Sequence, residues 1–322
     1  MQVWRILFAA MILASCASVC WAAEEKSAHS LAKAIPVILD TDIGSDLDDT
    51  WALVMLLKSP QFNVKLITTT DGKAEFRAQQ IAKLLTVAKR TDIPIGLGDD
   101  KRDTNSPKSE LAGYSGKILN DGVGAIIDVI RESPEPITVI SIGPLDTLAA
   151  VLDRQPNVAS KANFVGMQGS IHTGYGGGAA SAEWNVRANI PAARKVFVAP
   201  WRQMIITPLD TCGRVVLSGA RFQAFKDSRD PCVQAILESC RAAEKKAAIN
   251  ELTTSSVLFD TVAIYLANPG PKPLLKLETL PIVVTNDGFT RIDASGRKIQ
   301  VATEWKSLEG YYDFLGKTLL EP

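Results

Sequence analysis

Five carboxylates crowd a ten-residue segment near the start of the chain, and this segment is the strongest candidate for a site of chemistry. They are Asp40, Asp42, Asp46, Asp48 and Asp49. The segment joins one apolar run, Val37–Leu39, to a second that begins at Trp51. Like charges at this density repel one another, and burying them unpaired is costly. A bound cation is the simplest means of offsetting the repulsion, so we expect the functional centre here.

The residue types in this cluster also indicate the kind of metal. Asp40 and Asp42 are two apart on a predicted strand, so their side chains point to the same side. Asp48 and Asp49 fall at the start of a predicted helix, where one of them could be only a cap. Oxygen ligands without Cys or His favour Ca²⁺ or Mg²⁺. An EF-hand loop does not fit, because position 12 from Asp40 is Trp51 instead of Glu.

Two later segments carry polar side chains that could complete a site. Glu183 and Asn185 flank Trp184 after the glycine-dense loop 169–178, and they could bind sugar hydroxyls. Surface loops often carry such a pair, so the pair alone decides nothing. Asp260 precedes an apolar helical stretch. It is therefore either an N-cap or a further carboxylate ligand of the same cation.

Short β-branched runs that alternate with helical patterns must position these groups. The predicted strands are Ile35–Leu39, Val64–Thr70, Ile93–Ile95, Ile137–Ile142, Asn163–Met167 and Met204–Thr207. The predicted helices between them are Thr50–Lys58, Phe76–Lys89, Val123–Arg131, Leu145–Asp153 and Pro191–Val198. This alternation is typical of a mostly parallel sheet with helices on both faces. Such sheets bind ligands beyond the carboxyl ends of their strands, where the aspartate cluster lies.

Beyond Pro208 the pattern changes to an elaboration of the same domain. The predicted elements are helices within 218–250 and at Leu258–Leu266, strands at Leu280–Val284 and Lys298–Ala302, and a last helix near Trp305–Leu319. No linker rich in Pro, Gly or Ser separates the two parts. We therefore predict one α/β domain over residues 35–322: an open, mostly parallel central sheet, with a helical and β-ribbon C-terminal elaboration.

Composition excludes two classes of protein. The 322 residues are 46% hydrophobic and 22% charged, which is ordinary globular composition and excludes disorder. Lys+Arg and Asp+Glu both number 35, so the formal net charge is zero. Nucleic acid and anionic membranes both favour basic partners. We expect neither as the main partner.

The N-terminus is typical of a targeting segment. Arg5 precedes the apolar run Ile6–Ala14, which is too short to span a bilayer as a stable anchor. One interpretation is a signal peptide over residues 1–22, followed by a linker at 23–34. The alternative is a lipoprotein signal that ends before Cys16, which would then carry a lipid anchor. Both interpretations export the protein, and we expect a periplasmic location.

Three cysteines remain beyond that segment. Cys232 and Cys240 lie eight apart on one predicted helix, too far for a bridge. A bridge from Cys212 to one of them and three free thiols remain open alternatives.

The separated motifs, in this order, resemble the inosine-uridine-preferring nucleoside hydrolase family. The resemblance runs from about Ile35 to Pro269. Its motifs are the aspartate-rich opening, Ser141-Ile142-Gly143-Pro144-Leu145, Met167 before the glycine loop, Glu183-Trp184-Asn185, Pro208-Leu209-Asp210 and Leu258-Phe259-Asp260. The resemblance implies calcium-dependent hydrolysis of the N-glycosidic bond of a ribonucleoside or related riboside. It also implies a homodimer or homotetramer.

The resemblance further implies roles for the metal-facing residues. Asp42 would be the general base toward a water held by Ca²⁺, and it would also be a calcium ligand. The other protein ligands would be Asp49, Asp260 and the backbone carbonyl of Ile142. Asp40 would support the site.

The remaining implied roles concern the substrate. Asp48 would hold ribose hydroxyls, and Met167, Glu183 and Asn185 would contact the ribose. For the leaving base, Trp184, Tyr175, Trp51 or Trp201 could stack on the ring, although core packing is the commoner role of any one aromatic residue.

The chain departs from the family pattern at several positions. Three residues instead of one separate Gly44 from Asp48, so the pattern does not place Asp46, which could replace Asp48 in the site. Two asparagine positions of the family appear as Lys73 and near Gly177. A histidine that protonates the leaving base in many members is Phe259 here.

Two other function classes remain open. A haloacid-dehalogenase-type phosphatase would use Asp40 as nucleophile with magnesium, but it leaves Glu183, Asn185 and Asp260 unexplained. An exported, non-catalytic protein that binds a riboside or sugar would account for the missing histidine and asparagines.

Overall fold

The computed structural model describes residues 34–98 and 113–321. The predicted signal peptide, Cys16 and the linker up to residue 33 lie outside the described residues. Residues 36–322 cluster as one unit, and the account below concerns that unit.

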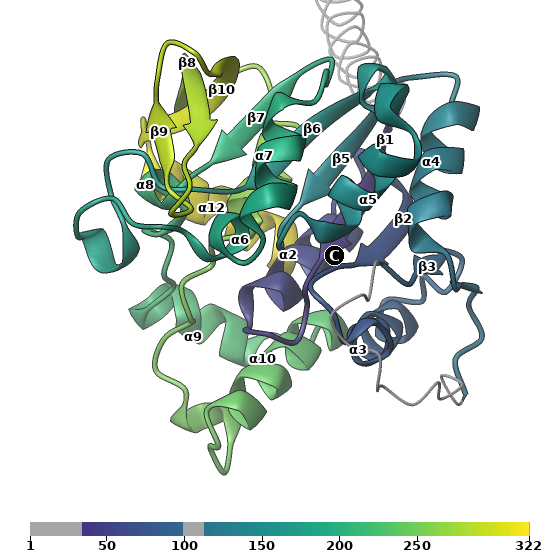
Figure 1. Cartoon of the computed structure of the whole chain (residues 1–322). Helices are drawn as coiled ribbons and strands as arrows, with labels where there is room; N and C mark the ends of the chain where they lie inside the picture. Colours follow the sequence, from purple (N-terminus) through teal and green to yellow (C-terminus); the bar gives the residue numbers. More distant parts are fainter. Residues whose placement is uncertain (1–33, 99–112, 322) are drawn as a thin grey trace, which may run out of the picture. The chain divides into compact units, whose positions relative to one another are not determined.

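The β-branched runs pair into a ten-stranded sheet within the described residues, in the order β4-β3-β2-β1-β5-β6-β7-β10-β8-β9 (Figure 1). The strands are β1 (Ile35–Thr41), β2 (Phe62–Thr69), β3 (Ile95–Gly96), β4 (Ile118–Leu119), β5 (Ile137–Ser141), β6 (Ala162–Met167), β7 (Met204–Thr207), β8 (Leu275–Val284), β9 (Thr290–Ile292) and β10 (Arg297–Trp305). The predicted open, mostly parallel sheet is confirmed.

Parallel register brings the carboxyl ends of the central strands to one edge. Asp40 of β1 pairs with Ser141 of β5, and Ser141 pairs with Gly166 of β6. Met167 then pairs with Thr207 of β7. The loops that follow these strands therefore open side by side, as expected for a ligand site in this class of fold.

Helices cover both faces of this sheet (Figure 1). They are α2 (Asp48–Leu57), α3 (Ala74–Val87), α4 (Gly122–Glu132), α5 (Asp146–Arg154), α6 (Trp184–Arg187), α7 (Ile190–Val198), α8 (Leu209–Cys212), α9 (Gly219–Asp227), α10 (Pro231–Ala243), α11 (Thr261–Leu266) and α12 (Leu308–Leu320). On one face α4, α5 and α7 pack in a row, while on the other α2 contacts α10, α11 and α12. None of the helices in the described ranges is long and apolar enough to cross a bilayer.

Two helices show how the pattern of apolar residues determines which faces of a helix are buried. In α4 the buried residues Val123, Ile126, Ile127 and Ile130 follow the helical repeat, so one stripe faces the sheet and the other faces water. In α2 every residue from Asp48 to Leu56 is buried. A helix that is apolar nearly all round must be covered, and the C-terminal helices supply that cover.

The C-terminal elaboration extends the main sheet. β10 pairs in parallel with β7, β8 pairs antiparallel with β10, and β9 pairs antiparallel with β8. The predicted β-ribbon is therefore the continuation of the central sheet. Trp305 ends β10, where we predicted helix, and α12 begins after Ser307, whose hydroxyl caps it by accepting from the Gly310 N–H at 2.9 Å.

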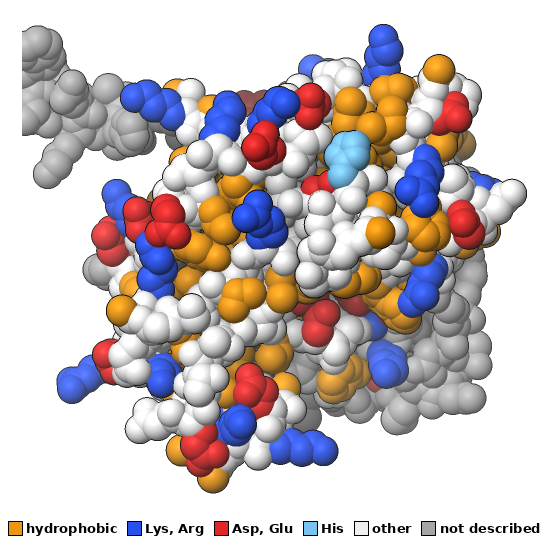
Figure 2. Space-filling model, turned by 90° about the vertical axis from the view of Figure 1, so that its left-hand side faces the viewer, with side chains coloured by type: hydrophobic (Ala, Val, Ile, Leu, Met, Phe, Trp, Pro, Cys, Tyr) orange, Lys and Arg blue, Asp and Glu red, His pale blue; other side chains and the backbone are white. Residues whose placement is uncertain are grey.

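The three cysteines of the described chain are free thiols, so the bridged alternative for Cys212 is not formed. Cys212 and Cys240 are buried, and Cys232 is partly buried. On the face drawn in Figure 2, Lys and Arg side chains are interspersed with Asp and Glu, which is in keeping with the zero net charge.

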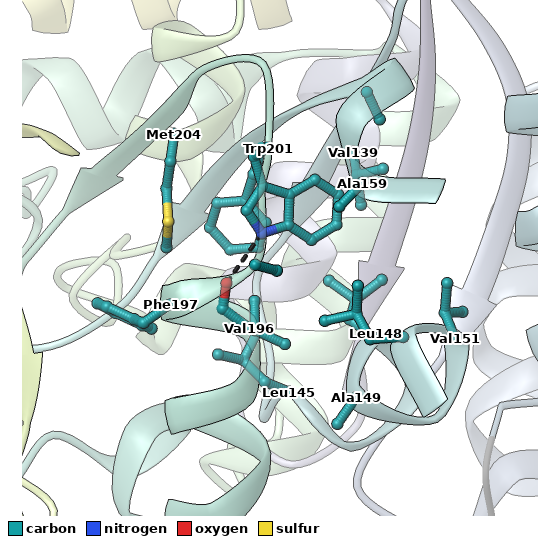
Figure 3. Packing of buried hydrophobic residues seen from close by; sticks show 14 of the residues in the cluster. Val139, Leu145, Leu148, Ala149, Val151, Ala159, Val196, Phe197, Trp201 and Met204 are labelled. Atoms are coloured by element: carbon teal, nitrogen blue, oxygen red, sulfur yellow. Dashed lines mark hydrogen bonds between the residues drawn. The ribbon is translucent and has the colours of Figure 1, made fainter. Parts of the chain in front are cut away.

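The packing between the sheet and α5 and α7 centres on Trp201 (Figure 3). Its ring lies 5.4 Å from the ring of Phe164 on β6, and its Nε1–H donates to the carbonyl of Val196 at 2.9 Å. Trp201 therefore anchors the turn after α7 to the core.

We expect Trp201→Ala to lower the free energy of unfolding by about 3–5 kcal/mol, because it opens a large cavity and removes one of the two hydrogen bonds to the Val196 carbonyl. Urea unfolding followed by circular dichroism measures this loss. Val198→Ala is the matched control, since Val198 is 71% exposed nearby and should change stability by no more than about 0.5 kcal/mol. Equal losses of stability in the two variants would contradict the anchoring role of Trp201.

Candidate active site

The carboxyl ends of β1, β5 and β6 meet around a cavity of about 290 Å³. Its lining combines predicted site residues from five separate segments with Ser45, Phe259 and Tyr175, of which only Tyr175 was predicted as a candidate for stacking on the base. The lining residues are Asp42, Ser45, Asp46, Asp48, Asp49, Ile142, Met167, Tyr175, Glu183, Trp184, Asn185, Phe259 and Asp260. Every residue predicted to bind the metal or the ribose thus reaches one cavity, whereas Asp40, Trp51 and Trp201 do not.

Asp40 lies behind the cavity. It is fully buried, and Thr68 Oγ1 donates to its Oδ1 at 2.7 Å. Burial raises the pKa of this carboxyl well above its ordinary value, and the hydroxyl of Thr68 opposes that rise. This burial behind the cavity fits the supporting role that we predicted for Asp40. The phosphatase interpretation does not, because a nucleophile must reach substrate.

The carboxylates at the helix starts do not cap their helices. Leu47 holds the N-cap position of α2 and makes no side-chain capping bond, and Asp48 and Asp49 follow it in the first turn. Asp260 holds the N-cap position of α11, yet its side chain makes no capping bond either. These side chains line the cavity instead, so the capping interpretation does not account for them. Thr41 Oγ1 donates to Asp49 Oδ1 and orients that carboxylate.

The electrostatics of the cavity are those of crowded anions. Burial raises the pKa of Asp42 to about 7, the Arg77 guanidinium opposes this rise, and Asp46 adds to it. Burial also raises the pKa values of Asp48, Asp49 and Asp260 well above their ordinary range, and neighbouring carboxylates raise them further.

The donor set fits a hard cation. Carboxylate oxygens of Asp46, Asp48 and Asp49 lie within 4.8 Å of one another. Asp42 and Asp260 line the same cavity, and no Lys, Arg, His or Cys lines it within the described residues. Oxygen ligands alone, several of them charged, suit Ca²⁺ or Mg²⁺, and an ion bound there offsets the mutual repulsion.

Arg77 on α3 braces the aspartate loop from behind. Its Nη1 donates to the carbonyls of Asp42 and Ile43 and, at 2.9 Å, to Ser45 Oγ. Its Nε donates to the Gly72 carbonyl at 2.9 Å. Arg77 is buried, and it uses its fork of donors to join the loops after β1 and β2.

The motif analysis missed Arg77, although one local signal was present. Arg77 lies on the buried stripe of α3, together with Ala74, Ala78 and Ile81. A charged residue within an apolar helical stripe requires buried partners. The sequence does not show which backbone groups those are.

Asn185 ties the ends of β5 and β6 together. Its Nδ2 donates to the carbonyl of Met167 at 3.0 Å and to that of Ile142 at 3.4 Å. A carbonyl oxygen has two lone pairs, so Ile142 can still accept a second partner. Asn185 therefore positions the carbonyl that we predicted as a metal ligand.

Glu183 holds the glycine loop in place. Its two oxygens accept from the backbone N–H groups of Gly169 at 2.8 Å, Asn185 at 2.7 Å and Val186 at 3.2 Å. Burial raises its pKa to about 7, and these three hydrogen bonds oppose the rise. Much of its accepting capacity is thus already used, which makes Glu183 a brace as well as a cavity-lining residue.

Three aromatic residues form the outer part of the cavity: Tyr175, Trp184 and Phe259. Tyr175 meets Phe259 edge-on, with ring centroids 6.1 Å apart. The Tyr175 hydroxyl accepts a hydrogen bond from the backbone N–H of Trp184 at 3.0 Å. Of the four aromatic residues considered for stacking on the base, Trp51 and Trp201 are excluded because both are buried in the core. Tyr175 and Trp184 remain.

The two positions where the family has asparagine, Lys73 and the neighbourhood of Gly177, lie outside the cavity. Lys73 is exposed ahead of α3 and does not line the cavity. Gly177 lines a second hollow together with His172 and Asp210. Phe259, by contrast, lines the cavity itself.

Comparison with known proteins decides the family. The sequence model described as "Inosine-uridine preferring nucleoside hydrolase" matches residues 37–309. The chain belongs to this family. It is therefore a nucleoside hydrolase, an N-glycosidase, as the motifs predicted.

Among curated relatives of this nucleoside hydrolase, the pyrimidine-specific ribonucleoside hydrolase RihA of Enterobacter sp. (strain 638) is 30% identical over 223 residues, which cover 64% of this chain and 69% of the relative. RihA of Escherichia coli O7:K1 is 34% identical over 182 residues, which cover 51% of this chain and 57% of the relative.

Solved structures confirm the nucleoside hydrolase fold. The plant nucleoside hydrolase PpNRh1 superposes with a TM-score of 0.71 at 21% identity, covering 89% of this chain and 99% of that one. An inosine-uridine preferring nucleoside hydrolase from Bacillus anthracis superposes with a TM-score of 0.71 at 18% identity, covering 89% and 100% of the two chains.

Gly143 provides a direct test of how tightly the cavity is packed. A Cβ at this position would lie 2.6 Å from Asp42 Oδ1 and 2.8 Å from Thr70 Cγ2. We expect Gly143→Ala to displace Asp42, the predicted general base, and to lower kcat by about 100-fold, because small misplacements of a reacting group are costly. Steady-state kinetics measures the loss.

Gly316→Ala is the matched control, since a Cβ there meets nothing within 4 Å. It should leave kcat unchanged and stability equal or slightly higher. Unchanged kcat in Gly143→Ala would show that Asp42 can move without consequence.

Proposed function

We propose that this nucleoside hydrolase releases the base from a ribonucleoside or related riboside by attack of water at C1′, with Asp42 as general base. One observation carries the proposal: Asp42 is buried and lines the cavity together with Asp48, Asp49 and Asp260, which come from a helix start and a distant segment. Burial raises the pKa of Asp42, which is the direction that favours acceptance of a proton by its carboxylate.

We further propose that Asp42, Asp49, Asp260 and the carbonyl of Ile142 hold Ca²⁺. When bound, the ion offsets the carboxylate charge, makes a nearby water more acidic and orients ribose hydroxyls. The oxygen-only donor set described above supports this proposal. Magnesium is the competing ion, because it shares the preference for oxygen.

The protein groups then divide the remaining work. Asp48 accepts hydrogen bonds from ribose hydroxyls, with Asn185, Met167 and Glu183 beside the sugar. Breaking the C–N bond leaves positive charge on the ribose, and the carboxylate-rich floor favours that charge. The new C–O bond comes from water, whose proton passes to Asp42. No covalent intermediate is required.

A second candidate function is binding without turnover. The observation that favours it is Phe259, which places a hydrocarbon ring in the cavity where a proton donor would assist the leaving base. Incubation with a nucleoside panel and p-nitrophenyl riboside separates the two functions. Ribose release supports the hydrolase, whereas calcium-dependent binding with no release from any of these compounds supports the binding protein.

Asp42→Ala should lower kcat by about 10²–10⁴-fold, the usual contribution of a general base. The substitution removes a buried anion among anions, so the variant should still fold, and circular dichroism checks this. Retained turnover in a folded variant would move the base to another carboxylate, with Asp46 as the first alternative.

Removal of calcium should abolish turnover and lower Tm. An ion that binds only the folded state adds about 2.7 kcal/mol at one hundred times its Kd. EGTA titration with differential scanning calorimetry, followed by readdition of Ca²⁺ or Mg²⁺, measures both effects and identifies the ion. Full activity and an unchanged Tm in excess chelator would contradict the metal proposal.

We also propose export, with cleavage after residue 22 or lipid attachment at Cys16, and assembly into a homodimer or homotetramer. The charge and apolar pattern of the N-terminus supports export. Mass spectrometry of the mature protein distinguishes the two processing routes, and light scattering measures the assembly.

A further inference from the structure

The cavity lining divides into a buried polar part and an aromatic part. Asp42, Asp49 and Asn185 are buried polar residues of the lining, and we call this part the floor. Tyr175 and Trp184 are each 48% exposed, and together with Phe259 they form the part that we call the rim. A ribose with its hydroxyls suits the floor, so the leaving group of the proposed reaction faces the rim.

The C-terminal hairpin of β8 and β9 contacts the first residues of the glycine loop. Thr290 of β9 is buried, and its hydroxyl accepts from the backbone N–H of Ser170 at 2.9 Å and donates to the Ser170 carbonyl at 2.8 Å. A Cβ on Gly169 would lie only 2.6 Å from the Thr290 Oγ1, so the two segments are closely packed. One buried hydroxyl therefore satisfies both backbone groups of a buried loop residue.

Ser170 connects this anchor to both arms of the glycine loop. Its own hydroxyl donates to the carbonyl of Thr173 at 2.8 Å and accepts from the backbone N–H of Ser181 at 3.0 Å. Thr173 in turn pairs with Ala179 in an antiparallel bridge. Tyr175 lies in the turn that this bridge closes, so the position of its ring depends on Ser170.

A second brace holds the loop independently of Thr290. The carboxylate of Asp210 accepts from the backbone N–H groups of Ile171 at 2.9 Å, His172 at 2.8 Å and Thr173 at 3.2 Å. Loss of the Thr290 hydroxyl should therefore shift the loop without unfolding it.

The same hairpin contacts the helix that carries Trp184. Gly288 is buried in the turn between β8 and β9, and a Cβ there would lie 3.2 Å from the Cα, Cβ and Cγ atoms of Arg187 at the end of α6. The guanidinium of Arg187 lies 5.6 Å from the centre of the Trp184 ring. The hairpin thus reaches both exposed aromatic residues of the rim, Tyr175 through Ser170 and Trp184 through Arg187.

We propose that the β8–β9 hairpin positions the leaving-group side of the cavity, with Thr290 as the positioning residue that sets Tyr175 through Ser170. The proposal rests on the riboside hydrolysis proposed above. It gives a role to the C-terminal ribbon, although no residue of β8, β9 or their turn belongs to the described cavity lining. Damage to the hairpin should weaken binding of the ring of a riboside and leave binding of the sugar unchanged.

The test measures the binding of two ligands that the protein cannot hydrolyse. One is phenyl C-riboside, in which a carbon–carbon bond replaces the glycosidic bond, and the other is anhydroribitol, its counterpart without a ring. Isothermal titration calorimetry at saturating Ca²⁺ gives the two Kd values. Thr290→Val keeps the shape of the side chain and removes the hydroxyl. We expect it to raise the Kd of phenyl C-riboside by about three- to tenfold, the scale of one aromatic contact. The Kd of anhydroribitol should stay within about twofold.

Two further variants separate positioning from a general loss of structure. Thr290→Ser returns the hydroxyl and should restore the affinity for phenyl C-riboside. Thr318→Val removes a hydroxyl that donates to the Phe314 carbonyl at 2.9 Å on α12, which supplies no residue to the described lining, and should change neither Kd. Circular dichroism checks that each variant folds. If Thr290→Val does not fold, Gly288→Ala takes its place, because its Cβ would push the hairpin away from Arg187 and should weaken phenyl C-riboside selectively.

The binding results decide the inference without reference to turnover. Equal weakening of both ligands in Thr290→Val would show a purely structural role, and no weakening of either would show that the hairpin does not position the rim. Each of these results overturns the inference, as does a wild-type protein that binds the two ligands equally well. If ribose release from nucleosides or p-nitrophenyl riboside persists in that case, the hydrolase proposal stands. Absence of ribose release by the wild-type protein at saturating Ca²⁺ contradicts the hydrolase proposal instead, whatever the two Kd values are.

Discussion

The mutual repulsion of carboxylates buried at one end of a sheet is the constraint on which this structure depends. The protein offsets part of it with its own groups, because Thr41 donates to Asp49 and Thr68 donates to Asp40. Arg77 lies close enough to oppose the raised pKa of Asp42, yet its donors are used on backbone carbonyls, on Ser45 and on the carboxylate of Asp71, which lies outside the cavity lining. The carboxylates of the cavity thus stay available to an ion and a substrate. A site of this kind is stable only because its scaffold is rigid.

That rigidity comes from connections between loops that are distant in sequence. Arg77 joins the loops after β1 and β2, and Asn185 joins the ends of β5 and β6. Glu183 fastens the glycine loop to α6. Each connection uses a buried polar side chain on backbone groups, which are then satisfied and fixed. Catalytic precision and burial of polar groups therefore have a common structural basis here.

The separation of a polar floor from an aromatic rim assigns different tasks to the two halves of a riboside. In the proposed function the ribose binds at the polar floor among the buried carboxylates and Asn185. In that proposal the leaving base faces the aromatic residues, where this chain departs from the family pattern at Phe259.

Local pattern was enough to predict the central strands, most helices and the set of cavity-facing carboxylates, because apolar periodicity and charge crowding are properties of neighbouring residues. It did not predict β4 or β9, since two or three residues are too few to show a repeat. It also left Asp260 undecided between a cap and a site residue, because both uses place an aspartate before a helix. The brace by Arg77, the clearance at Gly143 and the division of aromatic residues between core and rim required the packed chain. These depend on distances between segments tens of residues apart, and no single segment contains that information.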